Sequence, residues 1–219
     1  MGLLHIAATA LALNGVSAVP APQGGNAPAA KYCDASTTIC YSEWVSPEKI
    51  AYRVAIPENA TATADFDVLL QIQAPSTVGW AGIAWGGVMV NNPLTVAWPS
   101  GQSVVVSSRL ATARTYPTAY AGATYTVLPG TVANSTHWTL NVLAKGVTKW
   151  GSGAGTRLNP SSTAVSFAYA QSRTGPSEPA NNQSRFGIHN SRAKWSHNLA
   201  EAKISDFAAQ VAKLSGTAA

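Results

Sequence analysis

The feature that most constrains the fold is a series of short apolar runs, in several of which apolar and polar residues alternate. Valine, threonine and aromatic residues dominate the runs, and turn signals such as Pro99-Ser-Gly101 and Pro129-Gly130 separate them. Period-two runs that recur roughly every ten residues predict an antiparallel β-sandwich or barrel. The runs are AYRVAIP (51–57), FDVLLQIQAP (66–75), WAGIAWGG (80–87), LTVAWPSG (94–101), QSVVVSSR (102–109), ATYTVLPG (123–130), HWTLNVLAKG (137–146) and AVSFAYAQS (164–172).

Only the end of the chain has a helical pattern. Apolar side chains there follow helical spacing, and Asn198 with Glu201 three residues later resembles a helix cap. Gly216 can end the helix. We expect a short C-terminal helix whose apolar stripe packs on the sandwich; the stripe comprises Ile204, Phe207, Val211 and Leu214.

The ends of the chain suggest processing. Residues 1–18 have an apolar stretch that closes on small residues, which is typical of a signal peptide, and residues 19–30 are rich in Pro, Gly and Ala and resemble a flexible leader. We expect one domain over residues 31–210 and a tail over 211–219. No later run approaches the ~20 apolar residues of a membrane span. The expected product is a secreted, extracellular monomer with no membrane span.

The cysteines and glycosylation sequences agree with secretion. Cys33 and Cys40 are the only cysteines, and in an oxidising compartment a local disulfide is expected between them. Asn59, Asn134 and Asn182 each begin an N-x-Ser/Thr sequence, so they are candidate glycosylation sites.

The distribution of charge excludes several function classes. The formal net charge is +5, yet no Asp or Glu lies between Val68 and Ser177. A glycosidase needs two carboxylates beside its substrate, and the middle of the chain supplies none. Nucleic-acid binding needs basic side chains that cluster on one face, whereas the lysines and arginines in the middle of this chain are scattered singly along the sequence.

The glycine-rich segment GSGAG (151–155) matches neither a nucleophile elbow nor a phosphate loop.

Met89 and three histidines are the candidate metal ligands. Met89, after the Gly86-Gly87 pair, is the only methionine besides Met1, and His137, His189 and His197 follow the leader. No pair of histidines has metal-ligand spacing. A haem needs only two axial protein atoms, and Cys-x-x-Cys-His, which would attach it covalently, is absent. A b-type haem held by one His and one Met is therefore compatible with the chain. The alternative is that the methionine fills a gap in the core.

The chain resembles a known family around this methionine. The run GWAGIAWGGVMVNNPLTVAW (79–98) is similar to the haem-binding region of the cytochrome domain of cellobiose dehydrogenases, a DOMON-like, immunoglobulin-like β-sandwich. The similarity continues through VSSRLATARTYPTAYAG, NSTHW and FAYAQS and ends at GIHNSRAKWSHNL, so it covers roughly residues 41–207. It implies haem b as the cofactor, with Met89 and His189 as axial ligands. His197 stands where the family usually has an apolar strand residue, and it is the reserve candidate.

The same resemblance implies residues around the haem. In the family, polar residues of the segment that matches ATARTYPTAY hold the propionates. Here Arg114 replaces an aromatic hydroxyl and Tyr120 is retained. Trp80 and Trp85 would form walls of the pocket, with packing in the protein core as the alternative.

The sequence also departs from the family. AKGVTKW (144–150) lacks the cysteine that the family often has there, and Cys33 and Cys40 instead resemble the amino-terminal pair of related reductase cytochromes. Ala193 replaces a usual glycine, and Arg192 and Lys194 make the region after the expected histidine ligand unusually basic.

Two functions follow as hypotheses. A bare cytochrome would carry single electrons from a flavin dehydrogenase or small reductant to a copper polysaccharide monooxygenase or to ferric chelates. The alternative is a haem-free module that binds carbohydrate through exposed tryptophans, of which the chain has seven in total.

Overall fold

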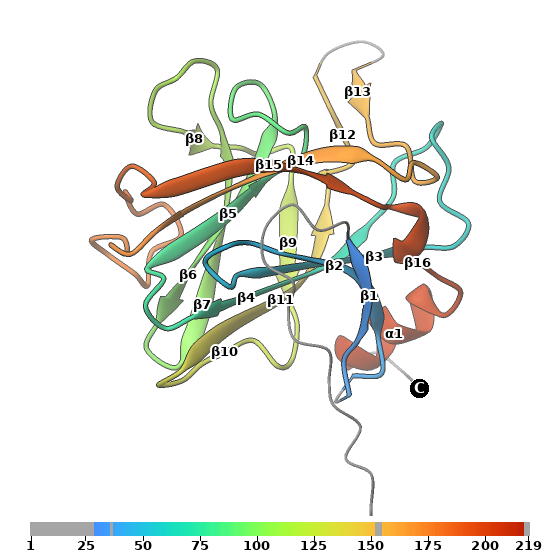
Figure 1. The fold of residues 1–219 in the computed structure, drawn as a ribbon, viewed down its shortest axis with the longest axis horizontal. Helices are drawn as coiled ribbons and strands as arrows, with labels where there is room; N and C mark the ends of the chain where they lie inside the picture. Colours follow the sequence, from blue (N-terminus) through green and yellow to red (C-terminus); the bar gives the residue numbers. More distant parts are fainter. Residues whose placement is uncertain (1–28, 36, 152–154, 217–219) are drawn as a thin grey trace, which may run out of the picture.

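Two sheets packed face to face form the protein (Figure 1). The computed structural model describes residues 29–35, 37–151 and 155–216; the expected signal peptide and most of the expected leader lie outside these ranges. Sheet I contains, in spatial order, β1 (Ala30–Cys33), β2 (Cys40–Val45), β3 (Ala51–Pro57), β4 (Val68–Pro75), β11 (His137–Lys145) and β10 (Val132–Ala133), with β9 (Thr124–Val127) on β11 and β16 (Lys203–Ile204) on β3.

Sheet II has six strands, and its neighbouring strands are antiparallel. In spatial order they are β15 (Ser191–His197), β14 (Val165–Ser172), β5 (Trp80–Ala84), β6 (Pro93–Ser100), β7 (Ser103–Leu110) and β8 (Thr118–Ala119). A separate hairpin joins β12 (Lys149–Trp150) to β13 (Thr156–Arg157). The expected all-β antiparallel sandwich is confirmed.

The core between the sheets follows from strand alternation. Tyr52, Val54 and Ile56 of β3 point inward, because alternate residues of a strand share one face. Across the core, Trp44 of sheet I stacks on Trp195 of sheet II with ring centroids 4.4 Å apart. The burial of these aliphatic and aromatic side chains between the layers drives the association of the two sheets.

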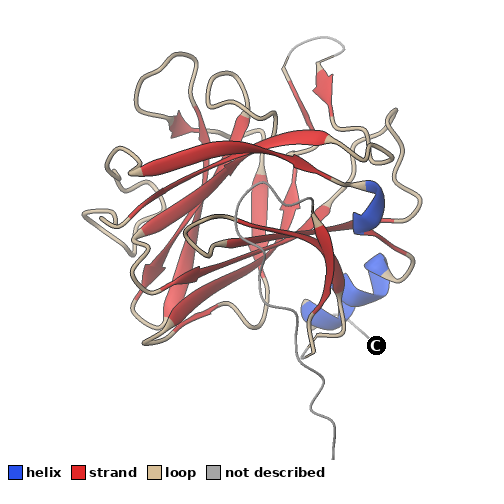
Figure 2. Cartoon of the chain, viewed as in Figure 1, coloured by secondary structure: helices blue, strands red, loops and turns tan. Residues whose placement is uncertain are grey.

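The helical segment begins later than the sequence predicts. Asn198 Oδ1 accepts a hydrogen bond from the Glu201 backbone N–H, but the cap leads into a single 3-10 turn, η1 (Ala200–Ala202). The strand β16 then pairs with β3, and this extended segment delays α1 (Phe207–Leu214). The expected tail boundary at residue 210 therefore falls inside α1. Figure 2 shows both helical segments at one end of the sandwich.

The β1–β2 hairpin and α1 cover part of the outer face of sheet I. Cys33 and Cys40 oppose each other in the hairpin and form the expected disulfide. Phe207 of α1 joins Leu69 and Leu143 in a second apolar cluster on this face. In the described ranges, no helix is both long and apolar enough to cross a membrane.

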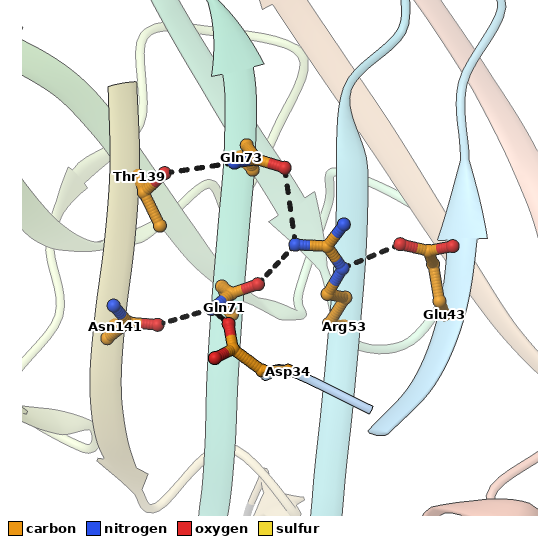
Figure 3. Close-up of polar contacts among 7 residues, drawn as sticks. All are labelled: Asp34, Glu43, Arg53, Gln71, Gln73, Thr139 and Asn141. Atoms are coloured by element: carbon orange, nitrogen blue, oxygen red, sulfur yellow. Dashed lines mark hydrogen bonds and ion pairs between the residues drawn. The ribbon is translucent and has the colours of Figure 1, made fainter. Parts of the chain in front are cut away.

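The rest of that face carries a polar network around Arg53 (Figure 3). Arg53 is only 6 % exposed, and its Nε donates to Glu43 Oε2 at 2.6 Å. Its Nη1 donates to the side-chain carbonyls of Gln71 and Gln73. The Tyr32 ring covers the guanidinium at 3.6 Å. The carboxylate, the amides and the ring together compensate the burial of this charge.

His197 is a buried core residue next to the stack of Trp44 on Trp195. It is fully buried, its Nδ1 accepts a hydrogen bond from Trp195 Nε1 at 3.1 Å, and its ring lies 5.3 Å from that of Phe167. Burial lowers the pKa of His197 to about 3. The imidazole is therefore neutral in the folded protein at neutral pH.

Removal of the Glu43 carboxylate should destabilise the protein. We expect Glu43→Ala to lower the free energy of unfolding by about 2 kcal/mol, because it leaves a buried guanidinium without its anionic partner while the amides remain. Urea unfolding measures the change. Asp67→Ala, which breaks the exposed pair between Asp67 and Lys145, is the matched control and should cost under about 1 kcal/mol. Equal losses in the two variants would contradict the role given to Arg53.

Acid should destabilise the fold through His197. Its pKa is depressed on folding, so the stability contribution is complete above pH 6.5 and is lost as the pH falls toward the folded value of about 3. We expect a loss on the order of 4 kcal/mol over this window from His197 alone. His197→Gln should flatten the pH dependence of the unfolding free energy between pH 6 and 4, measured by urea titrations. An unchanged slope would show that other groups determine it.

Candidate functional site

Sheet II presents apolar side chains on its outer face as well as on its inner face. Alternate residues of β5 and β6 point away from the core and pack together there, and residues from neighbouring strands and loops join them. We call this cluster the outer apolar face. It comprises Trp80, Ala84, Leu94, Val96 and Trp98, with Met89, Val105, Ala168, Ala170 and Phe186 packed against them.

Small residues occupy the middle of this face. Gly82 and Ala84 of β5 lie directly opposite Ala170 and Ala168 of β14. Their side chains barely rise above the sheet, whereas Trp80 and Trp98 carry large rings on the same side. The face thus has a low floor beside bulky aromatic groups, which suits a flat apolar ligand.

The loop from β5 to β6 places Met89 against the outer apolar face. Asn92 organises this loop, since its Nδ2 donates to the backbone carbonyls of Val88 and Val90 at 3.1 and 2.9 Å. A Cβ on Gly86 would collide with the Asn92 side chain, and Gly87 has a φ of +76°. The Gly-Gly pair is therefore needed for the tight turn that precedes the methionine.

The β14–β15 loop carries His189 to the same sheet. The loop's Phe186 packs over the outer apolar face, with its ring 4.9 Å from Trp80 and 6.1 Å from Trp98. Asn190 fixes the end of the loop, because its Oδ1 accepts from Ser172 Oγ at 3.0 Å and from the Arg173 N–H at 2.9 Å.

The two candidate ligands adjoin opposite ends of β5. The Met89 loop leaves β5 after Ala84, whereas His189 precedes Asn190, whose N–H donates to Gln171 O near Trp80. His189 is half-buried, and burial, with a smaller effect of the Arg192 charge, lowers its pKa. A lowered pKa favours the neutral imidazole, which is the form that ligates metals.

A buried arginine clamps the β14–β15 loop to the sheet. Arg109 of β7 is 2 % exposed, and its Nη2 donates to the carbonyls of Asn182 at 3.0 Å and Ser184 at 2.9 Å. Its Nε donates to Ser107 Oγ and its Nη1 to Pro117 O. The acceptors that the structure describes around this guanidinium are all uncharged.

Tyr116 completes the clamp from the β7–β8 loop. Its hydroxyl donates to Ser184 O at 3.2 Å and accepts from the Phe186 N–H at 3.3 Å. Its ring lies 5.3 Å from that of Phe186. Sequence analysis missed Arg109, Tyr116 and Phe186. For Arg109, the alternation with Val105 and Ser107 along β7 would have assigned it to the outer face.

Two further predicted site residues gather here. Trp80 belongs to the outer apolar face, and its Nε1 is buried with no hydrogen-bond partner in the described structure. Arg114 is exposed on the β7–β8 loop. That loop adjoins the methionine loop, because Asn91 N–H donates to Ala111 O at 2.7 Å.

Three other candidates lie on the inner side of sheet II. Trp85 is fully buried in the main core, where its Nε1 donates to Thr95 Oγ1 at 2.9 Å, so it packs the core and does not line the outer face. Tyr120 packs against the same core and lines a groove of about 630 Å³ between β7 and β9. His197 also faces the core, which removes it as the reserve partner of Met89.

Of the remaining sequence predictions, one is wrong and one stays a prediction. All seven tryptophans are at most 6 % exposed, so the prediction of exposed tryptophans that bind carbohydrate is wrong. Asn59, Asn134 and Asn182 are exposed, and their glycosylation stays a prediction. Among the residues that the structure describes, no three His, Cys, Asp or Glu side chains are grouped to hold a metal ion.

Loss of the Arg109 clamp should loosen the loop that carries His189. We expect Arg109→Gln to speed amide hydrogen exchange in residues 177–186 at least tenfold, because the Asn182 and Ser184 carbonyls each lose the guanidinium donor and keep only one hydroxyl donor. Mass spectrometry of peptic peptides measures the rates. The control is Arg173→Gln, which alters an exposed arginine of the same loop. Equal exchange rates of the loop amides in the two variants would contradict the role of Arg109 in holding the loop.

Comparison with known proteins matches this arrangement to one family. The family described as the cytochrome domain of cellobiose dehydrogenase matches residues 32–209. A pyrroloquinoline quinone-dependent pyranose dehydrogenase of Coprinopsis cinerea is 27 % identical over 174 residues, which are 79 % of this chain and 24 % of that protein. The chain thus spans about a quarter of the length of this relative.

Two solved structures have the same fold. The cytochrome b domain of pyranose dehydrogenase from Coprinopsis cinerea superposes with a TM-score of 0.75 at 25 % identity, over 85 % of this chain and 95 % of that one. The cytochrome domain of Myriococcum thermophilum cellobiose dehydrogenase gives a TM-score of 0.77 at 25 % identity, over 87 % and 97 %. The chain belongs to the family of cytochrome domains of cellobiose dehydrogenase.

Proposed function

We propose that this protein is an extracellular b-type cytochrome that carries single electrons, with Met89 and His189 as the axial ligands of its haem. One observation carries the proposal. The only methionine of the described residues packs on the outer apolar face, and the loop with His189 lies over that same face through Phe186. Family membership supports haem as the cofactor.

The residues present fit a haem. The outer apolar face combines a low floor at Gly82 and Ala84 with large rings beside it, as a flat macrocycle requires. The buried Trp80 Nε1 is a donor without an acceptor, and a haem brings two carboxylates as acceptors. The exposed guanidinium of Arg114 is suited to a propionate, because a charge-assisted hydrogen bond is stronger than a neutral one.

The chain's own residues set the properties of such a site. When bound, haem supplies reversible one-electron chemistry at its iron. Met89 contributes a thioether, which raises the reduction potential relative to a second imidazole. Phe186 and Trp98 exclude water from the face, and Arg109 holds the loop that presents His189.

The partners follow from the chemistry of the family. We propose a sugar-oxidising dehydrogenase as electron donor, with a flavin as cofactor or with pyrroloquinoline quinone as in the Coprinopsis relative. The proposed acceptor is a copper polysaccharide monooxygenase or a ferric chelate. Redox encounters of this kind are small and transient, which suits a monomer. The proposed location is extracellular, with residues 1–18 removed and the three asparagine sites glycosylated.

Absorption spectra test the cofactor and the ligands. The purified protein, incubated with hemin, should show an intense Soret band that sharpens and shifts when dithionite is added. Met89→His should retain haem and lower the reduction potential, because the axial sulfur is lost. His189→Ala should abolish the six-coordinate spectrum. Spectroelectrochemical titration measures the potential.

The controls are His137→Ala at an exposed histidine and His197→Gln in the core, and both should keep the wild-type spectrum. A preparation that binds no hemin would refute the cytochrome function. A wild-type spectrum for His189→Ala, or a wild-type potential for Met89→His, would refute that ligand alone.

A further inference from the structure

Five exposed cations surround the outer apolar face. Arg192 and Lys194 of β15 lie opposite Ala170 and Ala168, so they share the outer side of sheet II with these alanines. Together with three arginines from the adjoining loops they form what we call the cationic ring. It comprises Arg114, Arg173, Arg185, Arg192 and Lys194, all exposed.

The ring borders the face on several sides. Arg173 directly follows β14, and Arg185 stands over the Tyr116 ring at 4.7 Å, beside the clamp on β7. Sheet II runs from β15 through β14, β5 and β6 to β7, so its two margins are about 19 Å apart at the usual strand spacing. The cations are thus spread over an area much wider than a small ion.

These charges lack anionic partners within the described residues. The three ion pairs found there join Arg53 to Glu43, Lys145 to Asp67 and Arg157 to Asp65. Of the nine carboxylate side chains in the sequence, Glu178 belongs to the β14–β15 loop, and Glu48 reaches across from the β2–β3 turn to hydrogen-bond with Ser191 at the start of β15. Glu178 Oε2 accepts a hydrogen bond from Asn181 Nδ2 at 2.9 Å.

The charge distribution is therefore polarised across the sandwich. The Asp and Glu side chains between positions 34 and 67 and between positions 201 and 206 belong to sheet I, to its turns or to the C-terminal helical region. Five like charges on one face repel one another when the protein is alone, and a complementary negative surface relieves that repulsion.

We propose that the cationic ring is the docking surface for an acidic protein partner in electron transfer. The inference rests on the proposed cytochrome function and adds the chemistry of the partner. The width of the ring favours a protein surface over a small anion, since one small ion contacts only one or two of its members. The outer apolar face at its centre brings the partner next to the proposed haem.

Paired probes test the charge preference. Cytochrome c is basic, and succinylation of its lysines makes it acidic while its haem stays in place. At low ionic strength, thermophoresis with both proteins oxidised should show at least tenfold tighter binding of the succinylated form. The difference should fall as salt is added, because the Debye length shortens from about 30 Å at 0.01 M to about 3 Å at 1 M.

Charge reversal locates the surface. Arg192→Glu with Lys194→Glu should weaken binding of succinylated cytochrome c at least tenfold. The matched control is Lys31→Glu with Lys213→Glu, which makes the same change in net charge at exposed lysines on the sheet I side and should alter binding less than twofold. The haem spectrum of each variant is recorded first, so loss of the cofactor is distinguished from loss of docking.

Three results would overturn the proposal. The first is equal binding of the two cytochrome c forms, and the second is an equal loss in the control variant, which would reflect net charge alone. The third is slower oxidation of the Arg192→Glu and Lys194→Glu variant by ferricyanide with unchanged binding of the succinylated protein, which would assign the ring to small anions.

Discussion

The structure depends on a sheet that is apolar on both faces. Along β5, Ala81 and Ile83 enter the core between the sheets, while Trp80 and Ala84 face outward and meet Leu94 and Val96 of β6. An antiparallel sheet commonly leaves one face to solvent, so a second apolar face needs its own cover. Two loops supply the cover here, and their covering role places the methionine and the histidine loop over one surface.

Much of the architecture could be predicted from the sequence. The apolar runs gave most of the longer strands, and the spacing of Cys33 and Cys40 gave the hairpin disulfide. Alternation also contained information that the prediction did not use. Trp80 and Trp85 are five residues apart, an odd separation, so a single extended segment places them on opposite sides of the sheet. The family resemblance placed both tryptophans at the haem, whereas their odd separation in sequence puts them on opposite faces of the sheet.

Long-range contacts could not be predicted in the same way. Arg109 binds carbonyls 73 and 75 residues away in sequence, and nothing local marks Asn182 and Ser184 as acceptors. The start of α1 depended on the parallel pairing of β16 with β3, a contact between residues 147 positions apart in sequence. The direction in which Tyr120 faces could not be predicted either, because it directly follows β8, and a strand of two residues is too short for an alternation pattern.

Two buried arginines show how the two faces differ. Arg53 on sheet I is paired with the carboxylate of Glu43, and a second carboxylate, that of Asp34, accepts from Gln71 Nε2 in the same network. Arg109 on sheet II is satisfied by carbonyls and a hydroxyl, which provide hydrogen bonds without cancelling its charge. These hydrogen bonds, with the Tyr116 and Phe186 rings 5.8 and 5.5 Å from the guanidinium, offset part of the cost of burying the charge. The positive charge therefore remains on the side where the cationic ring lies, and the clamp that orders the histidine loop adds to the field that draws an anionic partner toward it.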